Sequence, residues 1–253
     1  MEQEEIASIL DRFLDTSHYR QDLTGLEKGQ TPKIFAVFCS DSRVEARAFA
    51  ENPLNYVFGA ETIGNHITGI MGSAGYAVDH LKTVKLIAVI GHIGCGAVSA
   101  AYKLSRNLAP EFYPKDLQEA VAMTVKKLME PVKAAIVMDD AEEAIVSEMK
   151  PVAQFFANVK NLLGDDEEQY LPKHAEANVH LQVGVLLALK QLKDDVKNGK
   201  RAVVGCIYDF TSRYGGPGTL CMVNINGSIP DVYNNPSVKS FMEAHSQKIR
   251  TFI

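Results

Sequence analysis

Apolar residues alternate along this chain between short continuous runs and stripes at helical spacing. The continuous runs are rich in β-branched residues and predict five strands, over 34–38, 54–58, 84–90, 201–208 and 219–225. The helix-spaced stripes predict helices between them, over 97–104, 117–129, 141–163 (with a kink or break at Pro151) and 178–196, with one more from Ser73 and a last one over 237–249. Nearly continuous apolar strands that alternate with helices favour a parallel sheet. We therefore predict an α/β fold with a mostly parallel central sheet, made of four parallel strands and an antiparallel edge strand and flanked by helices.

The N-terminal segment predicts a separate feature. Its apolar residues recur on one face of a helix over 4–16, which must lie on its own domain or on a partner subunit. We find no internal repeat and no low-complexity linker. The simplest organisation is a single domain over 1–253, with an N-terminal helical arm at about 1–30 and a helical insert at about 111–177.

Composition narrows the class of protein. The chain has 253 residues, of which 46% are hydrophobic and 23% charged, which is ordinary for a globular protein with a substantial core. The formal net charge is −5 and no basic tract occurs, so we expect no nucleic-acid partner. The apolar runs are too short to span a bilayer, and acidic residues follow Met1 where a secretory signal is basic. These features predict a cytoplasmic protein without a membrane partner.

Four cysteines in a chain of this size do not make a disulfide framework. Cys206 and Cys221 lie inside apolar runs, and we interpret them as small buried hydrophobic residues. The other two lie where predicted strands end, in positions better suited to a ligand or a nucleophile.

Two short motifs carry the candidate chemistry. Cys39-Ser-Asp-Ser-Arg follows the first strand, and Gly-His92-Ile-Gly-Cys95-Gly follows the third. Sites in open α/β sheets form at the carboxyl ends of strands, so we expect these motifs to meet. Thiolate and imidazole are the ligands that zinc prefers, and catalytic zinc sites use three protein ligands with a fourth position open. Cys39, His92 and Cys95 therefore predict a Zn²⁺ site, and neither motif supplies the fourth Cys or His of a closed structural site.

Asp41 and Arg43 alternate with Cys39, so that all three side chains can point to one side of an extended segment. Arg43 can hold a carboxylate through two parallel hydrogen bonds. Held in this way, Asp41 stays ionised and can accept a hydrogen bond from a water on the metal. Released, it can become the fourth ligand and close the site.

The two motifs together, in this order, resemble those of the β-class carbonic anhydrases, which carry Cys-x-Asp-x-Arg and a later His-x-x-Cys-Gly. The resemblance extends through 74–98 and, more faintly, through 178–226, where a strand ends Gly-x-Ile-Tyr-Asp-Phe. It implies reversible hydration of CO2 to bicarbonate, a homodimer or dimer-based oligomer, and Cys39, His92 and Cys95 as zinc ligands. Asp41 and Arg43 map onto the catalytic dyad of the family, and in some members the equivalent of Asp41 also binds zinc in an inactive form.

The sequence departs from the family pattern at one charged position. The family usually has Arg-Asn-x-x-Asn after the second strand, where this chain has Glu61 to Asn65. No residue clearly matches the glutamine that some members use to hold bicarbonate. Two alternatives to CO2 hydration therefore stay open: a related zinc hydrolase of carbonyl sulfide or carbon disulfide, and a non-catalytic family member.

Histidines outside the motifs are candidates for proton transfer. His66 lies in a glycine-rich loop and is a candidate proton shuttle, whereas His80 lies on a predicted helix and is better interpreted as structural.

Overall fold

The computed structural model describes residues 2–14, 23–129, 141–164, 166, 171–214 and 216–228. Two compact units divide the chain, Met1–Gln30 and Thr31–Ile253. The first contains helix α1 and a short 3₁₀ turn; the second contains the remaining elements. In chain order the helices are α1 (Glu2–Leu14), α2 (Met71–Asp79), α3 (Gly96–Ser105), α4 (Leu117–Leu128), α5 (Ala141–Leu163), α6 (Pro172–Leu187) and α7 (Lys190–Lys197). The strands are β1 (Ile34–Cys39), β2 (Val57–Thr62), β3 (Leu86–His92), β4 (Ala202–Asp209) and β5 (Thr219–Ile225).

The five strands form one sheet in the order β2-β1-β3-β4-β5. The pairs β1–β2, β1–β3 and β3–β4 are parallel, and β5 runs antiparallel to β4 at one edge. This arrangement confirms the predicted sheet of four parallel strands with an antiparallel edge strand. The single-domain organisation, with its arm at 1–30 and insert at 111–177, stays a prediction.

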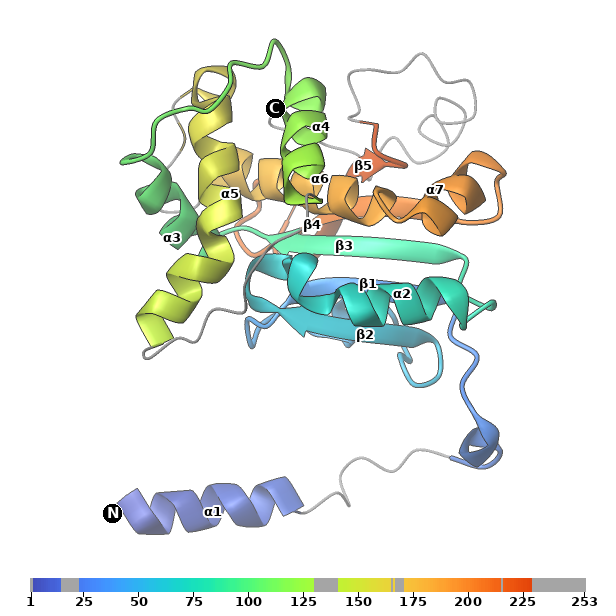
Figure 1. Ribbon diagram of the computed structural model, residues 1–253. Helices are drawn as coiled ribbons and strands as arrows, with labels where there is room; N and C mark the ends of the chain where they lie inside the picture. Colours follow the sequence, from blue (N-terminus) through green and yellow to red (C-terminus); the bar gives the residue numbers. More distant parts are fainter. Residues whose placement is uncertain are drawn as a thin grey trace. The chain divides into compact units, whose positions relative to one another are not determined.

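One face of the sheet packs against α2, α6 and α7 in a core of mostly aliphatic side chains. A second core joins α3, α4, α5 and α6, and it also includes the side chains of Cys39 and Cys95. In Figure 1, α3 and α5 lie beside one another at the end of the sheet where β3 ends. The carboxyl ends of the central strands therefore face a helical layer, and the candidate motifs lie at this junction. Among the described residues, no helix has the length and apolar character needed to cross a membrane.

Helix α6 lies directly against the backbones of β3 and β4. A Cβ added at Gly91 would lie 2.7 Å from Val179 Cγ2, and one added at Gly205 would lie 2.6 Å from Val179 Cγ1. Atoms do not approach this closely, so only glycine lets the helix lie at this depth. Since Gly91 immediately precedes His92, the packing of α6 sets the position of the end of β3.

The second strand and the long helix after it along the chain, predicted over 54–58 and 178–196, have other bounds in the structure. The second strand was expected over 54–58 but begins at Val57, because a turn at Pro53 to Tyr56 precedes it and Asn55 has a left-handed φ of 54°. Glu61 is therefore part of edge strand β2 and does not follow it. The helix expected over 178–196 begins at Pro172, a favoured first helical residue, and gives way to α7 after Ala188.

Helix α5 continues through Pro151, so the break allowed there is absent. The glycine-rich loop predicted around His66 contains two 3₁₀ turns, and α2 begins at Met71, ahead of the helix start predicted at Ser73. The predicted helix over 237–249 lies outside the described residues.

Candidate metal centre

The two motifs meet at the carboxyl ends of β1 and β3. Cys39 is the last residue of β1, His92 is the last residue of β3, and Cys95 immediately precedes α3. All three are buried, and one ligand atom of each lies within 4.8 Å of the others. The two sulfurs are 3.8 Å apart. The three residues can therefore bind a metal ion together.

The imidazole of His92 is oriented for a ligand at Nε2. Its Nδ1 lies 3.0 Å from the carbonyl oxygen of Ile93, which can only accept, so Nδ1 carries the proton. Nε2 then presents a lone pair, and among the described residues it has no hydrogen-bond partner, although His92 is only 1% exposed. An unpaired buried nitrogen is costly. A metal bound to Nε2 would remove this energetic cost. Metal-binding histidines typically donate a hydrogen bond from their other ring nitrogen, as Nδ1 does here.

The sulfurs also favour a cation. The Cys95 thiol beside it lowers the pKa of Cys39 to about 4, with His92 adding to the effect and burial opposing it. The neighbouring Cys39, together with burial, raises the pKa of Cys95. The pair thus accepts one negative charge readily and resists a second. A divalent cation would neutralise two thiolates, which is the donor set that zinc prefers.

Asp41 lies beside this cluster and is held by Arg43. The guanidinium Nε donates to Asp41 Oδ1 at 2.8 Å, and a terminal nitrogen donates to Oδ2 at 2.7 Å. The backbone N–H of Arg43 adds a third bond to Oδ1 at 3.0 Å. Arg43 therefore holds the pKa of Asp41 well below its ordinary value, and the carboxylate stays ionised. Asp41 Oδ2 is 3.7 Å from His92 Nε2, so its charge lies next to the cluster.

Backbone hydrogen bonds fix both loops. Ser40 donates its N–H to the carbonyl of Thr62, which ties the end of β1 to the end of β2. Ile93 donates to the carbonyl of Tyr208, which extends the pairing of β3 and β4 past His92. Gly94 then adopts a φ of 68°, where side chains are disfavoured, and lets the chain turn into Cys95. The positions of the candidate ligands thus follow from the sheet.

The family model that describes carbonic anhydrase matches residues 34–215. This range holds all five residues of the two motifs. The chain belongs to the β-carbonic anhydrase family.

Curated relatives in the family include carbonic anhydrase 2 of Mycobacterium tuberculosis, 40% identical over 103 residues, which cover 40% of this chain and 49% of that protein. β-Carbonic anhydrase 3 of Arabidopsis thaliana is 26% identical over 208 residues, which cover 77% of this chain and 69% of that protein. The chain thus spans about half the length of the first of these relatives.

Solved structures of the family share the fold. The β-carbonic anhydrase CcaA has a TM-score of 0.61 at 19% identity, with 88% of this chain and 96% of that chain covered. The enzyme CafA of Aspergillus fumigatus has a TM-score of 0.60 at 19% identity, with 96% and 98% covered.

A buried amide network supports the site and was not found from the sequence. Asn178 donates to the carbonyl of Gly64 at 2.9 Å, and Gln182 accepts from the N–H of Ile67 at 3.0 Å. The Gln182 amide also donates to Asn178. Both residues lie on α6 and hold the segment that follows β2. Polar residues that recur along a helix predicted to pack on the sheet could have signalled this role.

Phe210 is another residue to which the sequence assigned no role, although it ends the Gly-x-Ile-Tyr-Asp-Phe segment. Its ring lies against His92, with the ring centroids 5.2 Å apart, and the guanidinium carbon of Arg43 lies 4.4 Å from its centroid. The end of the predicted fourth strand places Phe210 at the same edge of the sheet, but no pattern along the chain indicates which side chains its ring contacts.

The remaining histidines and cysteines occupy different surroundings. His66, the candidate shuttle, is 3% exposed, and burial lowers its pKa to about 4, which disfavours proton exchange near neutral pH. His80 is exposed at the end of α2 and stacks on Tyr76 at 5.1 Å. Cys206 and Cys221 are buried, as predicted, and the Cys221 thiol donates to the carbonyl of Tyr214.

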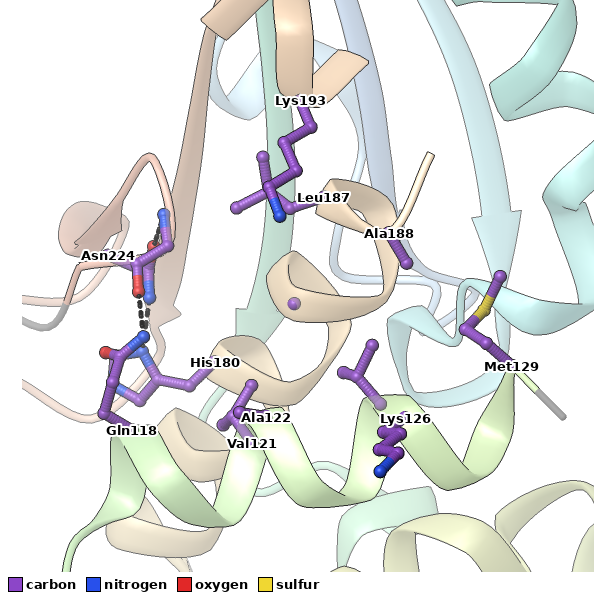
Figure 2. Close-up of a pocket in the computed structure, with 13 residues that line it drawn as sticks. Gln118, Val121, Ala122, Lys126, Met129, His180, Leu187, Ala188, Lys193 and Asn224 are labelled. Atoms are coloured by element: carbon purple, nitrogen blue, oxygen red, sulfur yellow. Dashed lines mark hydrogen bonds between the residues drawn. The ribbon is translucent and has the colours of Figure 1, made fainter. Parts of the chain in front are cut away.

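A cavity of about 500 Å³ lies between α4 and α6 and reaches β5. Figure 2 shows His180, Gln118 and Asn224 gathered at one end of it, with Lys193 near Leu187. Among the described residues that line it there is no residue of the two motifs. The cavity is therefore separate from the metal centre.

Proposed function

We propose that this protein binds Zn²⁺ through Cys39, His92 and Cys95 and catalyses the reversible hydration of CO2 to bicarbonate and a proton. The observation that carries this proposal is the buried group of two sulfurs and an unpartnered His92 Nε2, with the Asp41–Arg43 pair beside it. Membership of the family supports the choice of CO2 as substrate.

Zinc bound at this group would supply a Lewis acid that lowers the pKa of a coordinated water toward about 7. The side chains of the protein then have separate tasks. His92 is held in the correct tautomer by the carbonyl of Ile93, and Asp41 is kept ionised by Arg43. An ionised Asp41 can accept a hydrogen bond from the attacking water and orient it toward CO2. If Asp41 leaves Arg43, its carboxylate is near enough to close the site, since Oδ2 is 3.7 Å from His92 Nε2.

We further propose a cytoplasmic protein that forms a homodimer or a dimer-based oligomer. Likeness to the fold of the tetrameric β-carbonic anhydrases of Sordaria macrospora supports an assembly, at a TM-score of 0.57 and 18% identity. Analytical ultracentrifugation of the full chain would measure the assembly, and a monomer at micromolar concentration would contradict this part of the proposal.

The central experiment measures zinc content by mass spectrometry and CO2 hydration by stopped-flow across pH 6.5–9. We expect about one zinc per chain and a rate that rises with pH as bound water ionises. Asp41→Asn should retain zinc and lower kcat/KM by about 100-fold, within the range for loss of a general acid–base group. Asp79→Asn, the same change at an exposed position, is the matched control.

Stoichiometric zinc without CO2 hydration at pH 8 or above would overturn the proposal. Sulfide release from carbonyl sulfide or carbon disulfide, measured on the same preparation, would redirect it to a related hydrolase. Unchanged turnover of Asp41→Asn would remove Asp41 from the mechanism.

A further inference from the structure

Phe210 lies between the two motifs of the metal centre, next to His92 of one and Arg43 of the other. It directly follows β4, and its ring contacts both His92, a candidate zinc ligand, and Arg43, which holds Asp41. The ring centroids of Phe210 and His92 are 5.2 Å apart and their planes differ by 48°. The Arg43 guanidinium carbon lies 4.4 Å from the Phe210 centroid, within the range of a cation–π contact.

The position of Phe210 is fixed from both sides. Before it, β4 pairs with β3 as far as Tyr208 opposite His92, and the Tyr208 ring packs edge-on against Phe210 at 5.2 Å. Next to it, Asp209 is fully buried and its carboxylate accepts hydrogen bonds from the N–H groups of Thr211 and Tyr214 at 2.7 and 2.6 Å. The loop that carries the ring is therefore pinned by a buried carboxylate, and the ring can act as a fixed support.

The Arg43–Asp41 pair needs such a support. The Arg43 side chain is 59% exposed, and an ion pair in that position is screened by water and salt. The carboxylate also has an alternative partner, the metal position, because Asp41 Oδ2 is 3.7 Å from His92 Nε2. The contact with Phe210 restricts the guanidinium to the position from which it can hold Asp41, and unlike the ion pair it depends little on salt.

We propose that Phe210 is a positioning residue, whose ring holds Arg43 in place so that Asp41 stays on the guanidinium and the metal position stays open. This role rests on the proposed function of the site as a zinc centre. It concerns which of two partners Asp41 keeps, and the phenyl ring of Phe210 has no atom that could bind a metal.

The test uses Phe210→Leu and Phe210→Met, which keep an apolar side chain and remove the aromatic face, and Phe210→Tyr, which restores the face. Phe49→Leu is the matched control, because the Phe49 ring is partly buried and packs edge-on against Phe38 at 5.3 Å, outside the two motifs. Each full-length variant is first checked for folding by circular dichroism and for metal content.

The readout is the affinity of azide for the cobalt-substituted protein, followed by visible absorption. When only a fraction of molecules has an open metal position, the apparent Kd rises in proportion. We expect Phe210→Leu and Phe210→Met to raise the azide Kd by up to about 5-fold, the limit set by the loss of an exposed cation–π contact. The increase should grow between 20 and 500 mM salt, because only the screened ion pair remains. Phe210→Tyr should bind azide as the wild type does.

Equal azide affinity and equal salt dependence in wild type, Phe210→Leu and Phe210→Met, at equal metal content, would overturn the inference. The same increase in Phe49→Leu would also overturn it, because the effect would then be general loosening. Failure of the proposed function is a separate result, seen as absent CO2 hydration by zinc-loaded wild type, and the azide measurement does not depend on turnover.

Discussion

Replacing His66 by glutamine is expected to remove a pH dependence of stability that the burial of this imidazole creates. His66 is 3% exposed, and burial lowers its pKa from the ordinary 6.5 to about 4. Among the described residues, the Thr68 hydroxyl lies 3.3 Å from His66 Nδ1, and Glu148 Oε1 lies 3.6 Å from the same nitrogen. Burial also raises the pKa of Glu148. The imidazole of His66 and the carboxyl group of Glu148 therefore both lie in surroundings that disfavour their charged forms.

The sign and size of this pH dependence follow from the linkage between proton binding and folding. Between pH 6.5 and 4 the unfolded chain protonates His66 and the folded protein does not, so the free energy of unfolding falls as pH falls and levels off below pH 4. Over this pH range the free energy of unfolding falls by about 3 kcal/mol in all. At pH 5.5 the decrease amounts to about 1.4 kcal/mol. Glu148 contributes with the opposite sign, because a raised pKa in the folded state favours folding as pH falls. Glu148 is present in wild type and variant alike, so most of its contribution cancels in the comparison.

Urea unfolding of the zinc-loaded wild type and His66→Gln at pH 7.5, 6.5 and 5.5 tests this. The wild type should lose about 1.4 kcal/mol more than the variant between the first and last pH. His80→Gln, the same change at an exposed histidine, is the matched control. The His66→Gln substitution will change the free energy of unfolding at every pH. The comparison therefore uses the slope of this free energy against pH and not its absolute value. Equal slopes in wild type and His66→Gln would refute the assignment.

Three further substitutions test packing, a buried ion pair and the metal. Gly205→Ala should cost about 1–3 kcal/mol in urea unfolding, because the methyl would lie 2.6 Å from Val179 Cγ1, and a smaller cost in a Val179→Ala background would identify that clash. Arg201→Met should cost about 3–5 kcal/mol because Asp195 loses an ion pair at 3.0 Å and stays buried; a cost below about 1 kcal/mol would contradict this. Cys95→Ser should abolish zinc binding, measured by mass spectrometry, and stoichiometric zinc would remove Cys95 from the ligand set.

The sheet and the cluster could be predicted from the sequence because both depend on local signals. Continuous apolar runs mark central parallel strands, and β1 and β3 begin and end within two residues of their predicted bounds. Once the strands are parallel neighbours, Cys39 and His92 must lie at the same edge. The short separation of His92 and Cys95 needs only one turn, at Gly94. No long-range information was required to bring the three residues together.

The errors occurred where packing outweighs local preference. Strand β2 lies at the edge, and its burial alternates, so the run Phe58 to Thr62 has no continuous apolar character. The change from α6 to α7 at Leu189 has neither proline nor glycine to mark it. The role of Phe210 depends on contacts between β4, the end of β3 and the loop after β1. A pattern along the chain cannot show contacts of this kind.

Glu61 is the residue that fitted the family pattern least, and its place in the sheet changes its meaning. Glu61 pairs with Phe38 and Thr62 pairs with Cys39 across β1 and β2. Side chains alternate between the two faces of a sheet, so the carboxylate of Glu61 lies on the face of Phe38 and points away from that of Cys39. It is exposed on an edge strand, where a charge discourages unwanted strand pairing. The negative charge therefore acts on the edge of the sheet and not on the metal ligands, and it gives no reason to interpret the chain as a non-catalytic member of its family.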